Sequence, residues 1–150
     1  MPASLDARLA GRDTTPLPAG VLLRFQAISR APDPRSNHRW LLHDDRRLYL
    51  AFHSDDSEGA APFDTDYPDD ATTSLDVAEV SELLDAVLDD GRFATLDPFQ
   101  QGAPTAEGGM WRIVTARLDD GSVYEVVYDR VSNAMLDRLQ RVGSDHRTGS

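Results

Sequence analysis

Residues 111–129 read WRIVTARLDDGSVYEVVYD and carry the clearest hairpin pattern in the chain. Two runs rich in β-branched and aromatic residues flank Asp120–Gly121, a dipeptide that favours the positive φ angles of a two-residue type I′ turn. Such a turn would place Val114 opposite Val127 and apolar side chains on both faces of the hairpin. We therefore expect the hairpin to lie in the centre of a sheet. The face opposite to Val114 would carry Trp111, Ile113, Val126 and Tyr128.

A second hairpin is predicted nearer the amino terminus, after a strand at residues 21–29. The strand alternates apolar and polar residues, and residues 39–52 hold two apolar runs on either side of a polar turn. If the turn consists of Asp45–Arg46, His38 lies opposite His53. A shift of one residue would separate the two histidines, because each step reverses the face to which a residue points.

A helix is predicted between the two hairpins, within residues 75–91, LDVAEVSELLDAVLDDG. Asp76 can cap its amino end, and Glu79 three residues later completes a capping box. Gly91 is placed to end it. Apolar residues recur at helical spacing and indicate a face that packs on a core. This stripe consists of Val77, Val80, Leu83, Leu84, Val87 and Leu88.

The segments on either side of the central hairpin are predicted to be a loop and a second helix. Residues 93–109 are rich in Gly, Pro and polar residues and are typical of a loop. The second helix would have Ser132 as its cap and Gly143 as its end. Its apolar face would carry Met135, Leu136, Leu139 and Val142.

The order of these elements is strand, hairpin, helix, hairpin, helix, which predicts an α+β fold. Consecutive hairpins imply an antiparallel sheet of about five strands, and the two helices must bury their apolar faces against one side of it. We predict a flexible arm at residues 1–19, a single domain at residues 20–143 and a tail at residues 144–150.

The amino-acid composition excludes several kinds of active site. The 150-residue chain has no Cys, which excludes disulfides, thiolate metal sites and a Cys nucleophile. It has no Lys and therefore no Walker A loop, and it contains no G-x-S-x-G nucleophile motif. No apolar segment approaches the length of a membrane span. We expect a cytoplasmic protein without catalytic activity, cofactor or membrane contact.

The negative charge is concentrated in one part of the chain. The formal net charge is −11, yet residues 48–91 contain no Lys or Arg and thirteen Asp or Glu, so the remaining residues carry a net charge of +2. This distribution argues against direct binding of nucleic acid by the acidic segment and permits a protein partner with a basic surface. A solvated acidic face that favours solubility is the alternative.

The densest acidic stretch is HSDDSEGAAPFDTDYPDD, residues 53–70, with seven carboxylates. Its spacing does not fit an EF-hand loop, although weak calcium binding stays open. As a docking surface, its acids would steer a basic partner and two isolated aromatics would anchor it. The steering residues would be Asp55, Asp56, Glu58, Asp64, Asp66, Asp69 and Asp70, and the anchors Phe63 and Tyr67.

Two further function classes remain open. His38 and His53, if they meet across the first hairpin beside Asp55 or Asp56, could hold a divalent metal for a metal-assisted hydrolase. Two exposed histidines at the end of a hairpin are the alternative interpretation. A structural or assembly subunit is also compatible with the sequence, and the oligomeric state is not predicted.

Part of the chain resembles a known family. The segments LDVAEVSELLDAVLDDGRFATLDP, WRIVTARLDDGSVYEVVYDR and AMLDRL resemble the emfourin-like proteins, small inhibitors of thermolysin-type metalloproteases. The resemblance spans residues 75–140 and consists of a capped helix, a D-G hairpin and a short C-terminal helix. The matching positions are Gly91, Phe93, Leu96, Pro98, Asp120 and Gly121.

The resemblance implies a binding or inhibitory role and carries over no inhibitory residue. The Arg-rich first hairpin, the acidic loop and the amino-terminal arm depart from the pattern of the family. We therefore expect a small acidic non-catalytic binding protein, inhibitory or antitoxin-like, that docks the acidic loop and the exposed side of the first helix on a basic site of a partner protein.

Overall fold

The computed structural model describes residues 13, 15–29, 37–52, 67–102, 110–131 and 133–146. Its strands are β1 (Val21–Ser29), β2 (His38–His43), β3 (Arg47–Phe52), β4 (Thr73–Ser74), β5 (Phe99–Gln101), β6 (Met110–Arg117) and β7 (Val123–Asp129). Its helices are α2 (Val77–Leu88), the 3₁₀ segment η2 (Asp89–Thr95) and α3 (Ala134–Asp145). No helix in these ranges is long and apolar enough to cross a membrane.

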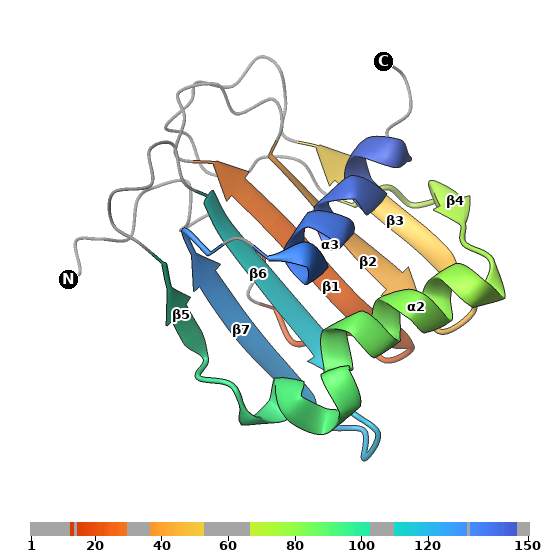
Figure 1. Ribbon diagram of the computed structural model, residues 1–150. Helices are drawn as coiled ribbons and strands as arrows, with labels where there is room; N and C mark the ends of the chain where they lie inside the picture. Colours follow the sequence, from red (N-terminus) through yellow and green to blue (C-terminus); the bar gives the residue numbers. More distant parts are fainter. Residues whose placement is uncertain are drawn as a thin grey trace.

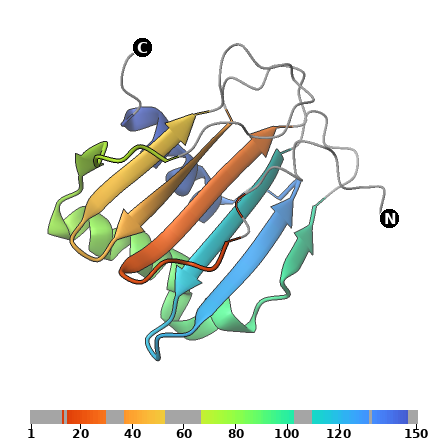
Figure 2. The same ribbon diagram turned by 180° about the vertical axis from the view of Figure 1, so that it is seen from behind.

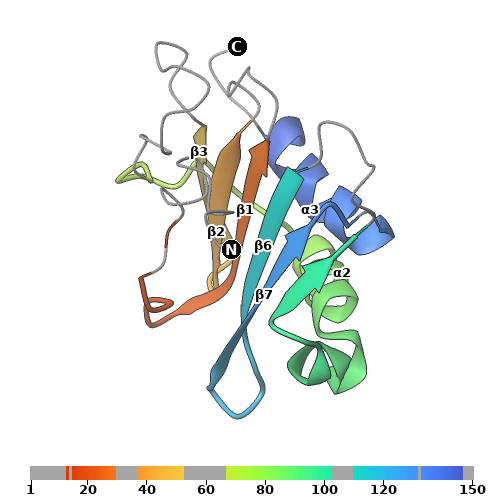
Figure 3. The same ribbon diagram turned by 90° about the vertical axis from the view of Figure 1, so that its left-hand side faces the viewer.

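The fold is α+β, as predicted, and has two layers (Figure 1). A seven-stranded sheet has the strand order β4-β3-β2-β1-β6-β7-β5, and α2 and α3 lie on the same side of it (Figure 3). The main core lies between the sheet and these helices and includes Phe25, Trp40, Leu83, Val126 and Leu136. Figure 2 shows the opposite face of the sheet, on which no described helix lies.

The sheet is mixed, so the prediction of an antiparallel sheet of about five strands is wrong in detail. β5 pairs with β7 in the parallel direction, and the two-residue β4 pairs with the edge of β3. Both added strands are short and lie at the edges. They are too short for an alternating pattern, and β5 falls in the segment predicted to be a loop.

The predicted register of the central hairpin is wrong by one residue. Val114 pairs with Val126 rather than with Val127. The turn has three residues, Asp119 to Gly121, closed by a 2.9 Å hydrogen bond from the Gly121 amide to the Leu118 carbonyl, and only Gly121 in it has a positive φ, 88°. Val126 and Tyr128 consequently face the helices with Val114, whereas Trp111 and Ile113 belong to a separate cluster.

The predicted register of the first hairpin is wrong for the same reason. His38 pairs with Phe52, not with His53, which lies outside the described residues. The third turn residue, Arg46, has a φ of 73°, and its amide donates to the His43 carbonyl at 3.0 Å. A left-handed third residue makes the turn one residue longer than predicted and shifts every pair across the hairpin.

The amino end of α2 is confirmed and its carboxyl end differs from the prediction. The Asp76 side chain accepts a hydrogen bond from the Glu79 amide at 2.8 Å. The helix ends at Leu88, and the next three residues, 89–91, all have positive φ values. At the other end of the predicted apolar stripe, Val77 is 68% exposed and does not belong to the core.

The cap and the end of α3 both differ from the prediction. Asn133, not Ser132, caps the helix, and its side chain accepts from the Leu136 amide at 2.8 Å. The helix runs through Gly143 to Asp145, two residues beyond its predicted end. A Cβ atom on Gly143 would lie 2.4 Å from the His38 ring. The glycine therefore permits a close approach of α3 to β2 and does not stop the helix.

Candidate functional site

Most of the predicted docking loop lies outside the described part of the chain. This holds for Asp55, Asp56, Glu58, Phe63, Asp64 and Asp66. Of the remaining predicted residues, Asp69 and Asp70 are exposed, and Tyr67 is half-buried.

Tyr67 is engaged within the protein. Its hydroxyl donates a hydrogen bond to Oδ2 of Asp13 at 3.1 Å, and the Arg39 guanidinium carbon lies 5.1 Å from the centre of its ring. Burial and the neighbouring charge of Asp13 raise the pKa of Tyr67 above its ordinary value. Its ring also packs against the cluster that includes Leu17 and Leu41. The Tyr67 side chain therefore attaches the end of the predicted docking loop to the face of the sheet opposite to the helices.

A buried polar network occupies the middle of that face. Arg24, with a side chain only 2% exposed, lies 3.4 Å from the carboxylate of Asp13 and 3.3 Å from that of Glu125. It also donates to the Thr15 carbonyl at 2.8 Å. The Gln26 amide group pairs with the Asp13 backbone through hydrogen bonds of 2.6 and 3.0 Å. The described part of the predicted flexible arm is thus bound to β1.

The ionisation of Asp13 reflects the same network. Desolvation by burial would raise its pKa, but the hydrogen bonds from Thr15, the charge of Arg24 and the hydroxyl of Tyr67 together lower it. The anionic carboxylate is therefore favoured in the folded protein. The side chains of Asp13, Arg24, Gln26 and Tyr67 all bond to other groups of this protein, although Nε of Arg24 has no partner among the described residues. We therefore interpret the network as structural.

An acidic concavity lies at the carboxyl end of α2. Four carboxylates, those of Asp85, Asp89, Asp90 and Asp119, line it together with Leu88 and Gly91, around a volume of about 600 Å³. Asp119 comes from the turn between β6 and β7, so the fold brings two distant segments together here. No basic side chain lines the concavity in the described ranges of the chain. We use the name acidic concavity for this set of six residues below.

An apolar niche adjoins the acidic concavity. Leu88, Ala94 and Leu118 line it, together with Gly91, Asp119 and Asp120, around a volume of about 260 Å³. The two hollows share Leu88, Gly91 and Asp119. They therefore form a continuous site that has an apolar wall on one side and carboxylates on the other.

The backbone increases the negative potential of this site. The last carbonyl groups of a helix carry partial negative charge, and acidic residues there are unfavourable by about 0.3–1 kcal/mol each. No basic residue lies in the last turn of α2. Arg92 approaches Asp89 to 3.8 Å, but both side chains are largely exposed, so this pair is weak. The site thus holds an excess of negative charge that helix stability does not explain.

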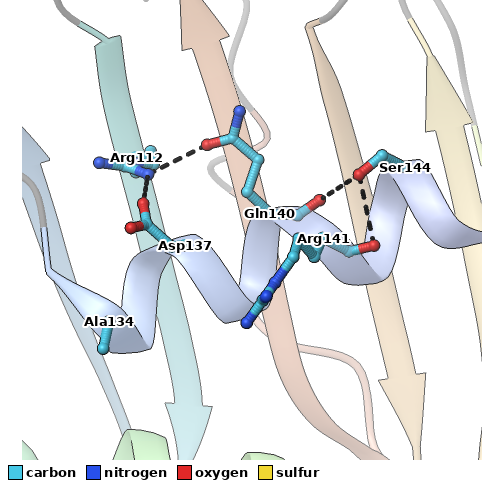
Figure 4. A pocket seen from close by; sticks show the side chains of 6 residues that line it. All are labelled: Arg112, Ala134, Asp137, Gln140, Arg141 and Ser144. Carbon is cyan, nitrogen blue, oxygen red and sulfur yellow. Dashed lines mark hydrogen bonds and ion pairs between the residues drawn. The ribbon is translucent and has the colours of Figure 1, made fainter.

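A second surface hollow, of about 590 Å³, lies along α3 beside Arg112 (Figure 4). The Arg112 side chain is nearly buried and donates to Asp137 at 3.2 Å, to Gln140 at 3.0 Å and to the Val131 carbonyl at 2.7 Å. Figure 4 shows Asp137 and Gln140 pointing toward Arg112, whereas Arg141 points away from them. Arg112 therefore joins α3 to β6 and is not available as an anion site.

Of the residues of the predicted metal site, the structure describes only His38, and His53, Asp55 and Asp56 lie outside the described residues. His38 is buried, stacks on the Phe52 ring at 4.9 Å and lies under Gly143 of α3. Within the described ranges there is no group of three or more His, Asp or Glu side chains that could hold a metal ion.

The sequence pattern pointed to part of the acidic concavity only. Residues 48–91 were recognisable as acidic, and carboxylates at the end of a helix are a visible mismatch with its dipole. Asp119 and Asp120 gave no indication of a site, because Asp and Gly are common in turns and a D-D-G sequence predicts a turn. Their place beside α2 depends on how the hairpin packs against the helix.

Comparison with known proteins adds no relative: no family model matches the chain, and neither a curated protein nor a solved structure matches it. The resemblance to the emfourin-like proteins therefore stays a prediction.

Proposed function

We propose that this protein is a non-catalytic binding protein that receives a basic side chain of a protein partner in the acidic concavity. The observation that carries the proposal is the meeting of four carboxylates with an apolar niche at the carboxyl end of α2. An acidic surface of this kind accelerates association with a basic partner and selects against acidic ones.

The shape of the site favours Arg or Lys over a free metal ion. Both side chains combine an apolar stem with a charged head, and the stem commonly lies along apolar surface while the head stays at the polar end. Leu88, Ala94 and Leu118 would contact the stem, and Asp85 and Asp119 would face the head. An Arg head would gain most, because its planar fork can bind a carboxylate through two hydrogen bonds.

The predicted docking of the acidic loop on a basic partner is part of the same proposal. The acids of residues 55–70 would add long-range attraction, and the acidic concavity would supply the contact geometry. An inhibitor or antitoxin-like protein is the concrete form, and the emfourin resemblance of residues 75–140 supports it. The hydrolase alternative has no comparable support, because His38 pairs with Phe52.

The proposal can be tested with a fluorescent hexa-arginine peptide, followed by anisotropy at low and high salt. We expect Asp85→Asn with Asp119→Asn to weaken binding about three- to tenfold, since two exposed ion pairs are lost. The matched control replaces Asp97 and Asp145, two exposed acids outside the site, by Asn. Both double variants change the net charge equally, so a general charge effect would be the same in both.

Equal weakening by the two double variants would mean that only net charge matters and would contradict the proposed site. The wild type and the two double variants can then be used to capture partners from a lysate of the source cells. A basic partner that is lost with the Asp85 and Asp119 changes, and retained by the control, would support the proposal. A stable homo-oligomer that buries the acidic concavity would favour the assembly-subunit alternative.

A further inference from the structure

A separate cavity of about 330 Å³ lies above β7, between the end of α2 and the start of α3. Figure 1 shows how these two helix ends approach the same part of the sheet from different directions. The cavity is lined mainly by apolar side chains, and its size is at the lower end of small-molecule sites, which span about 300–1,000 Å³. The apolar wall consists of Val87, Phe93, Leu96, Val131 and Met135.

Tyr128 lines this cavity with a hydroxyl group that has no protein partner in the described part of the chain. The residue is only 4% exposed, and no hydrogen bond of its hydroxyl is found there. The neighbouring Tyr124, by contrast, donates to the Leu96 carbonyl. The Tyr128 hydroxyl is not among the fully buried polar atoms without a partner, so solvent reaches it from the cavity. It is therefore able to donate a hydrogen bond to a molecule that enters the cavity.

Two of the polar groups around the cavity favour a negatively charged acceptor, against the negative charge of Asp89 and of the carboxyl end of α2. Arg92 and Asn133 line it, and Asn133 marks the amino end of α3, where exposed amides carry partial positive charge. Asp89 is also present, but its exposed pair with Arg92 at 3.8 Å can open for a competing carboxylate. Burial raises the pKa of Tyr128, which keeps its hydroxyl protonated and able to donate.

We propose that this cavity binds a small carboxylic acid with an apolar, ring-sized body. The Tyr128 hydroxyl would donate a hydrogen bond to the carboxylate, and Arg92 and the amino end of α3 would favour its charge. The body would pack against Phe93, Leu96 and Met135, whose flexible thioether can adapt to different shapes. This inference does not depend on the acidic concavity, since the two sites share only Asp89 among their lining residues.

The test is a titration of the ¹⁵N-labelled protein with benzoate, with benzylamine as a probe of similar shape and opposite charge. We expect benzoate to shift the amide signals of Phe93, Tyr128 and Met135, and benzylamine to leave them unchanged. Tyr128→Phe should raise the dissociation constant about tenfold, because a hydrogen bond to a charged group is lost. Tyr49→Phe removes a hydroxyl from β3 outside this cavity and is the matched control.

A second variant tests the cavity without touching the hydroxyl. Ala86 lines the cavity from α2, and Ala86→Met should fill part of it while keeping a good helix former at this position. Benzoate shifts should then be lost in a protein that unfolds at an unchanged or higher urea concentration. Binding that survives both variants, shifts confined to other parts of the protein, or equal shifts with benzylamine would each overturn the proposal.

Discussion

The hydroxyl of Tyr67 donates a hydrogen bond to Oδ2 of Asp13, 54 positions earlier in the chain, across 3.1 Å. Asp13 in turn contacts Arg24 at 3.4 Å, so three segments meet on the face of the sheet that no described helix covers. This network replaces a helix as the cover of that part of the face. Tyr67, which was predicted from the sequence to be a docking anchor, therefore takes part in contacts that hold the fold together.

We expect Asp13→Ala to lower the free energy of unfolding by about 1–3 kcal/mol, because the Tyr67 hydroxyl and the Arg24 guanidinium lose an acceptor. Tyr67→Phe should cost about 0.5–1.5 kcal/mol. Urea unfolding of both single variants and the double variant gives the coupling energy between the two residues. Strictly additive effects would show that the hydrogen bond does not stabilise the folded state.

The lowered pKa of Asp13 predicts a loss of stability in acid. The unfolded chain holds this carboxyl at its ordinary pKa, 3.8, and the folded chain at a lower one. Its contribution to stability is therefore present above about pH 4 and is lost as the pH falls through the folded value. Urea midpoints measured from pH 5 to pH 2 should fall less steeply for Asp13→Asn than for the wild type, and parallel curves would contradict this account.

Gly143→Ala should destabilise the protein by about 1–3 kcal/mol, although alanine is normally the better helix former. The added Cβ would lie 2.4 Å from the buried His38 ring, which is stacked on Phe52 and has little room to move. Ser144→Ala, at the next and exposed position of α3, is the control and should be nearly neutral. His38→Ala should reduce the cost of the Gly143 change, since it removes the clashing ring. A stabilising Gly143→Ala would show that the contact with His38 is looser than described.

Asp90→Gly should raise stability and weaken binding of hexa-arginine at the same time. Asp90 has a φ of 56°, a left-handed conformation that costs a non-glycine residue about 1 kcal/mol relative to glycine. Its carboxylate lines the acidic concavity. Thermal unfolding and peptide anisotropy on the same sample separate the two effects. A less stable variant would mean that the carboxylate supports the turn rather than the site.

The sequence alone indicates one part of the acidic concavity. The acidic character of α2 and the mismatch at its carboxyl end are visible at Asp89 and Asp90. The contribution of Asp119 cannot be seen in the sequence, because it depends on how the turn between β6 and β7 packs beside the end of α2. The unpaired hydroxyl of Tyr128 is likewise invisible, since in sequence it is one more aromatic residue in a strand.

The sequence by itself determined the types of the longer elements and the α+β class. The Asp76 cap, the apolar stripe of α2, the alternation in β1 and the β-branched run of β6 are local patterns. Local backbone preferences and amphipathicity are sufficient to produce them.

Only the tertiary structure decided the hairpin registers and the sites. A D-D-G turn accommodates two or three loop residues, and the observed choice places Val126 and Tyr128 under the helices, where their burial stabilises the fold. The same packing brings Asp119 to the end of α2 and leaves the Tyr128 hydroxyl in a cavity. These relationships join residues that are distant in sequence, and burial of apolar surface across the whole sheet selects among registers that local preferences leave nearly equal.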